Sequence, residues 1–165
     1  MLKEQPKIVP PKSNLQYTLD RIALIALVCF LVYFLIYWPG LPERVPVHFD
    51  GAGNPNSYGN KTTLLLLPLI SLILFFVLTA INKRPDLFNY PVKITEENAE
   101  RQYTLARNMV SGLNAALIIA FFFLAWKTGM LVQGKADGLG PWFLPVFLGI
   151  TMGPVVIYMI MAFRK

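Results

Sequence analysis

Four long apolar runs, separated by polar segments, dominate the pattern of the chain. They cover residues 22–38, 62–81, 109–132 and 142–163. A helix rises about 1.5 Å per residue, so about 20 apolar residues cross a hydrocarbon core about 30 Å thick. The pattern therefore predicts an all-α integral membrane protein whose four transmembrane helices form one antiparallel bundle.

The polar segments set the expected helix boundaries. Residues 1–21 contain Pro6, Pro10 and Pro11, which oppose helix formation and predict a short, mobile tail before a membrane domain at 22–165. Pro68 is expected to kink the second helix. Thr95 is a candidate N-cap, and neither Pro nor Gly interrupts residues 95–111. The predicted helices are thus 22–38, 62–81, 95–132 and 142–163, and the third is the longest.

Composition agrees with a membrane protein. Of the 165 residues, 55% are hydrophobic, and the mean hydropathy is +0.51. The net charge of +6 arises from basic residues that lie beside the apolar runs rather than in one patch. This distribution is typical of topology signals and of contacts with anionic lipids, so we expect a lipid bilayer and no nucleic acid as the partner.

Lysine and arginine counts predict the orientation. The tail holds four, the first loop two, the second loop five, the third loop two and the carboxy-terminus two. Basic residues accumulate on the cytoplasmic side of membrane proteins. Both termini and the second loop are therefore expected in the cytoplasm, and the first loop on the opposite side.

Small residues in the third and fourth apolar runs are candidates for close helix packing. Gly112 and Ala116 form one small-xxx-small pair, and Gly149 and Gly153 form a second. Such pairs let two helix backbones approach closely, although the pattern alone is a weak signal.

Residues 39–61, between the first two spans, are the densest in unusual residues and are expected to form a non-helical extracytoplasmic cap loop. Hydrophobic and polar residues alternate from Val45 to Asp50, which is typical of an extended segment. Pro42 and Pro46 restrict the residues before them to extended conformations. A tight turn is expected at 51–56, after which residues 58–61 return to the membrane, where Lys61 can anchor the second helix.

His48 is the only histidine, and histidine is the residue type whose charge ordinarily changes near neutral pH. Three interpretations are open: a structural hydrogen bond to the turn, a weak metal site with Asp50 and Asn54 or Asn56, and contact with a ligand or partner. Metal sites in proteins usually have three or four strong ligands, so no metal is expected. With no nucleophile and base, no phosphate loop and no paired acids, neither an enzyme nor a cofactor is expected.

The cap pattern resembles the domain of unknown function 1648 of bacterial membrane proteins over about residues 20–80. The resemblance is carried by Leu41-Pro42, Val45-Pro46, His48-Phe49, Gly53, Tyr58 and Lys61. It implies a bacterial inner-membrane protein in which Pro46, His48, Gly53 and Lys61 match the family pattern. Many relatives have an acid where this chain has Asn56, which argues further against a cation site.

The same domain forms the amino-terminal part of the SdpI-like immunity proteins, which protect a producing cell from its own toxic peptide. SdpI itself has additional carboxy-terminal helices. The resemblance implies an immunity or sensing protein whose outward loop recognises an extracytoplasmic peptide or envelope component. Two alternatives remain: a transporter or accessory subunit, indicated by Pro68 and Pro154, and a structural assembly partner that binds another membrane protein through the fourth helix.

Overall fold

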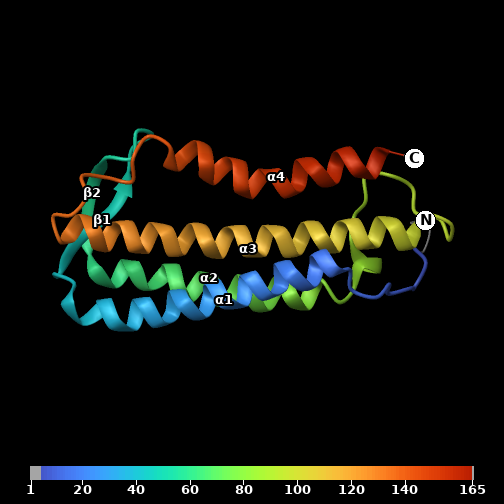
Figure 1. Ribbon diagram of the computed structural model, residues 1–165, viewed down its shortest axis with the longest axis horizontal. Coiled ribbons are helices and arrows are strands. Elements are labelled where there is room, and N and C mark those ends of the chain that lie inside the picture. Colours follow the sequence, from blue (N-terminus) through green and yellow to red (C-terminus); the bar gives the residue numbers. More distant parts are fainter. Residues whose placement is uncertain (1–4, 165) are drawn as a thin grey trace.

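The computed structural model describes residues 5–164, so the first four residues of the predicted tail lie outside the described part. Four helices are long and apolar enough to cross a membrane. These are α1 (Asn14–Tyr37), α2 (Leu66–Ile81), α3 (Ala99–Val132) and α4 (Phe143–Phe163). They lie side by side, with both chain ends at one end and the strands at the other, which we call the termini end and the hairpin end (Figure 1).

Helix α1 begins at Asn14 rather than at residue 22, so the expected tail is wrong for residues 14–21. Ser13 is the N-cap, and its Oγ accepts a hydrogen bond from Gln16 N at 3.1 Å. The described part of the remaining tail is also held in place. Tyr103 Oη donates to the carbonyl of Pro6 at 2.9 Å, and Arg107 donates to the carbonyl of Pro10. The three prolines therefore precede the helix but do not leave the segment free.

Helix α3 runs without interruption from Ala99 to Val132, and the prediction that it is continuous and the longest is confirmed. It begins four residues later than expected because residues 95–98 form a separate turn. The Asn98 side chain accepts from Thr95 N at 2.9 Å, so the side chain of Thr95 does not cap the helix. Pro68 lies in the first turn of α2, after the 3-10 segment Lys61–Leu65, where its missing N–H interrupts no helical bond.

The helices pack unequally, because α3 is the centre of the structure. In its most apolar stretch 50% of the residues are buried, against 22% or less in the other three helices. Helices α1 and α2 lie on one side of α3, whereas α4 lies on the other side and packs mainly on α3 (Figure 1). Most side chains of α4 consequently face outward, where a membrane protein meets lipid.

The two predicted pairs of small residues have different surroundings in the structure. A Cβ at Gly112 would lie 3.4 Å from Pro154, so this glycine does allow α3 and α4 to approach, and Ala116 is buried. Gly149 and Gly153, by contrast, face open space, since a Cβ at either would meet no described atom within 4 Å. No described helix packs on this second pair, so its role in close helix contact stays a prediction.

The predicted cap loop contains a two-stranded antiparallel sheet, β1 (Arg44–Phe49) and β2 (Pro55–Asn60). Arg44 pairs with Asn60 and Val45 with Gly59, and the register shifts on both sides of His48. Such a bulge leaves one residue unpaired and bends the strand. Short 3-10 turns at Trp38–Gly40 and Lys61–Leu65 join this hairpin to α1 and α2.

Candidate functional site

The hairpin turn is organised by Asp50. Its Oδ1 accepts hydrogen bonds from the backbone N–H groups of Ala52 at 2.9 Å and Asn54 at 2.8 Å, and its Oδ2 accepts from the Asn54 side chain. The bond from Asn54 N, followed by the other donors, lowers the pKa of the Asp50 carboxyl. A lowered folded-state pKa means that the stabilisation is present above the unfolded pKa and is lost as pH falls through the folded value.

Gly53 fixes the hairpin to the loop before α4. Its carbonyl accepts from Leu139 N at 2.8 Å, and its φ of +83° lies in the left-handed region that glycine favours. A Cβ at Gly53 would lie 2.6 Å from the oxygen of Gly140, and one at Gly138 would lie 2.5 Å from the oxygen of Gly53. Two chain segments distant in sequence thus meet backbone to backbone, and the predicted site residue Gly53 is the point of contact.

Lys61 closes the base of the hairpin. Its Nζ lies 3.0 Å from Glu43 Oε1, donates to the carbonyl of Leu41 at 3.3 Å and lies 5.6 Å from the centroid of the Trp38 ring. These contacts join the end of α1 to the start of α2. Lys61 is therefore a structural clamp as well as a charge at the end of the second span.

The two faces of the hairpin differ in character. Val45 is fully buried in a cluster with Phe30, Phe34, Leu64 and Ala125, so β1 is packed on the helix ends. The exposed side chains of the hairpin are mostly polar. They include His48, Asn56, Ser57 and Tyr58, whereas Pro46 is buried and Pro42 is exposed outside the strand. The hairpin therefore presents a polar surface on a rigid, apolar base.

His48 and Asn56 form a side-chain pair that joins the two strands. His48 Nδ1 lies 2.6 Å from Asn56 Oδ1, and because an amide oxygen only accepts hydrogen bonds, the Nδ1–H is the donor. Asp50 is engaged with its own turn rather than with His48. Among residues 5–164, no group of three or more His, Cys, Asp or Glu side chains is placed to hold a metal ion.

Replacing His48 with alanine is expected to loosen the hairpin modestly. The substitution removes one hydrogen bond at an exposed position, which contributes about 0.5 to 1.5 kcal/mol. Hydrogen exchange of the strand amides should accelerate by no more than about tenfold, and His48→Gln should restore part of the protection. If zinc raised the unfolding temperature of the wild type but not of His48→Ala, a metal-ligand role would replace this structural one.

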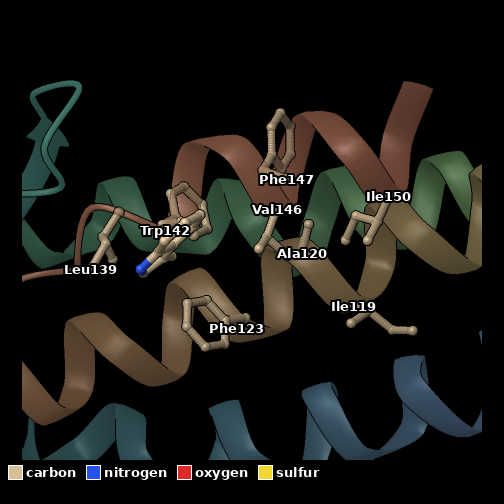
Figure 2. Close-up of a pocket in the computed structure, with 9 residues that line it drawn as sticks. Ile119, Ala120, Phe123, Leu139, Trp142, Val146, Phe147 and Ile150 are labelled. Atoms are coloured by element: carbon tan, nitrogen blue, oxygen red, sulfur yellow. The ribbon is translucent and has the colours of Figure 1, made fainter. Parts of the chain in front are cut away.

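An apolar groove lies between α3 and α4 at the hairpin end (Figure 2). It has a volume of about 320 Å³ and adjoins the loop that Gly53 holds. Trp142, at the amino-terminal end of α4, is 75% exposed at its margin. The lining comprises Ile119, Ala120 and Phe123 of α3, Val146, Phe147 and Ile150 of α4, and Leu139, Trp142 and Phe143 at the hairpin end. Apolar lining beneath a polar cap suits an amphipathic ligand.

At the termini end the structure contains a polar cluster that was not predicted, made of the buried Asn82, Arg107 and Ser111 and the half-buried Asp20. Asn82 Nδ2 donates to Ser111 Oγ at 2.9 Å and to the carbonyl of Arg107 at 3.1 Å. Ser111 in turn donates to Asp20 Oδ1 at 2.7 Å. The sequence contains one signal for this cluster. The spacing of Arg107, Ser111 and Asn114 places three polar residues on one face of a continuous helix.

Replacing Asn82 with alanine is expected to destabilise this end of the protein by about 1 to 3 kcal/mol. The substitution removes two buried hydrogen bonds and opens a cavity where α2 ends on α3. Unfolding in detergent would measure the effect, with Asn89→Ala, at an exposed position of the same loop, as the matched control. Equal stabilities for the two variants would contradict the role assigned to the cluster.

Comparisons with known proteins bear on the hairpin region and on the whole chain. A family model described as "Domain of unknown function (DUF1648)" matches residues 24–72. A relative from Archaeoglobus fulgidus, described as an uncharacterized protein, is 28% identical over 162 residues, covering 90% of this chain and 87% of the relative. No solved structure matches. The match covers residues 24–72, which run from α1 through the hairpin into α2, and it is to the same domain of unknown function 1648 that the hairpin residues resemble.

Proposed function

We propose that this multi-pass membrane protein is a binding protein rather than an enzyme, with its hairpin end facing the outside of the cell. In this proposal the hairpin and the groove between α3 and α4 recognise an amphipathic extracytoplasmic peptide. Both termini lie in the cytoplasm of a bacterial cell, as the distribution of lysine and arginine favours. The biological role would be immunity or sensing, as in the SdpI-like proteins that the sequence resembles.

The observation that carries the proposal is the position of the groove directly beside the fixed cap. Leu139 lines the groove and also donates its N–H to Gly53 of the hairpin turn. An amphipathic peptide at the membrane surface places its apolar face below the headgroups and its polar face above them. The groove would take the apolar face, and the exposed side chains of His48, Asn56 and Tyr58 would meet the polar face.

The charge of the cap favours recognition by shape and hydrogen bonds. Arg44, Lys61 and Lys135 are balanced by Glu43, Asp50 and Asp137 in the two connecting segments at the hairpin end. Without a strong net charge, long-range attraction adds little to the binding of a charged ligand. Inside a bilayer the groove otherwise holds lipid chains, so specificity would depend on fit and on polar contacts at its margin.

Peptide binding in the groove can be tested by filling the groove with a larger side chain. Val146 lines it and is 54% exposed, so Val146→Trp should occupy the space without displacing buried side chains. Cells of a sensitive host would be challenged with a panel of envelope-active amphipathic peptides. Expression of the wild type should raise the inhibitory concentration of at least one peptide several-fold, and Val146→Trp should abolish that protection.

Val156→Trp supplies the matched control, because Val156 lies on the same helix, is 53% exposed and does not line the groove. This variant should protect as the wild type does. Sensitivity that stays unchanged across the whole panel when the wild type is expressed would refute the immunity role. Equal loss of protection in both variants would refute the groove as the binding site.

The open face of α4 supports a second candidate, that of an assembly partner. Gly149 and Gly153 are one turn apart and face space that no described residue fills. Close helix contact through such a pair would seat another membrane protein against α4. Leucine at both positions should then abolish a cross-link from α4 to that partner while leaving peptide protection intact, which separates this function from the first.

A further inference from the structure

The polar cluster at the termini end borders a small cavity between α1, α2 and α3. The cavity has a volume of about 50 Å³. Three cationic side chains line it, those of Lys12, Lys83 and Arg107, against the single carboxylate of Asp20. That carboxylate is already engaged, since Lys12 Nζ lies 2.7 Å from Oδ2 and Ser111 donates to Oδ1. The cavity therefore retains an excess of positive charge.

Two buried polar atoms at this cavity lack a partner among the described residues. They are Arg107 Nε, a donor, and Asn82 Oδ1, an acceptor, and both residues are only 5% exposed. Leaving such groups unpaired in a low-dielectric environment is unfavourable. Both atoms have almost no surface open to the cavity, so a ligand with an anionic oxygen and a hydroxyl group would pair with them once the two side chains turned toward it. The two unpaired atoms therefore favour a ligand that has an acceptor for Arg107 and a donor for Asn82.

A second cavity lies beside the first, along α1 and α2. It has a volume of about 210 Å³ and shares Lys12, Asp20 and Thr79 with the first. Its lining adds Arg21 at the polar part and the apolar side chains of Leu24 and Phe75. Asn82 lies directly after the last residue of α2, and Lys12 directly before the cap of α1. The two cavities therefore run from the ends of the spans into their apolar part.

We propose that these two adjacent cavities bind an anionic phospholipid with a hydroxyl-bearing headgroup, of which phosphatidylglycerol is the simplest. The phosphate accepts from Arg107 and is neutralised by Lys83 and Lys12, and a headgroup hydroxyl donates to Asn82. An acyl chain follows Leu24 and Phe75 along the groove between α1 and α2. Basic pockets between membrane helices bind anionic headgroups in this manner. The site lies at the opposite end from the hairpin, so it does not depend on the proposed peptide binding.

The full-length protein, purified in mild detergent, would be given equimolar phosphatidylglycerol and phosphatidylcholine with identical chains, and retained lipid would be counted by native mass spectrometry. The wild type should retain phosphatidylglycerol in preference by about tenfold. The double variant Lys12→Gln with Lys83→Gln removes two of the three cationic side chains at the headgroup, so it should lose most of that tenfold preference. Unfolding without added lipid would establish that the variant folds.

Lys127→Gln with Lys135→Gln is the matched control, because it removes the same charge from the other end of the molecule. It should retain lipid as the wild type does, and equal loss in both double variants would overturn the site. Leu24→Trp should also reduce retention by obstructing the apolar cavity. If inorganic phosphate stabilised the wild type as well as the lipid did, or if Leu24→Trp had no effect, the lipid would be the wrong ligand.

Discussion

Gly53→Ala is expected to destabilise the hairpin end by about 2 to 5 kcal/mol, the largest effect of any single substitution that we consider. Alanine at a φ of +83° is strained, which costs about 1 to 3 kcal/mol. The added Cβ would also lie 2.6 Å from the oxygen and 2.8 Å from the nitrogen of Gly140, and backbone atoms cannot move aside as a flexible side chain can. The loop before α4 would have to separate from the hairpin.

The direct measurement is hydrogen exchange at Leu139, whose N–H donates to Gly53 O at 2.8 Å. In Gly53→Ala its protection should fall by at least tenfold. Gly51→Ala provides a control in the same turn, since a Cβ there meets nothing within 4 Å and its φ is not positive. That variant should retain wild-type exchange. Wild-type protection of Leu139 in Gly53→Ala would contradict the backbone contact assigned to this glycine.

The four spans were predictable because bilayer thickness constrains sequence strongly. Runs of about 20 apolar residues satisfy both the length of a crossing helix and the need to bond every backbone group internally. The third helix was predicted as continuous because no Pro or Gly interrupts it before residue 112. These features depend on local composition alone, and the structure contains all of them.

Other features depend on contacts between distant residues and were missed. Residues 14–21 look like a polar tail, yet they form helix because Ser13 caps them and its Oγ also donates to Asn108 at 2.6 Å. The strand Pro55–Asn60 has no β-branched residue and exists through its pairing with β1. Propensity does not reveal either contact, because each joins parts of the chain that are separate in sequence.

The candidate site was predicted in part. The sequence predicted a candidate site in the segment that forms the hairpin. The structure places these predicted residues in the hairpin or at its base: Pro46, His48, Asp50, Gly53, Asn56, Tyr58 and Lys61. It did not reveal the apolar groove, because lipid-facing and groove-lining residues such as Val146 are equally apolar. It also indicated Gly149 and Gly153 as candidates for close helix packing, but spacing cannot show which face of a helix has a neighbour, and no described residue packs on this pair.

The central claim, that the hairpin end is an outward-facing recognition surface, depends first on orientation. The second loop has five basic residues and the first has two, which favours a cytoplasmic location for the second. Two exposed positions report the two ends: Ser57 on β2 and Glu97 in the turn before α3. Each would be changed to cysteine in a chain whose natural Cys29 is replaced by alanine.

Intact cells would be treated with a membrane-impermeant thiol reagent, and labelling would be compared before and after permeabilisation. We expect Ser57→Cys to be labelled in intact cells, and Glu97→Cys to be labelled only after permeabilisation. Labelling of Glu97→Cys in intact cells, with Ser57→Cys protected until permeabilisation, would place the hairpin and its groove in the cytoplasm and contradict the proposed function.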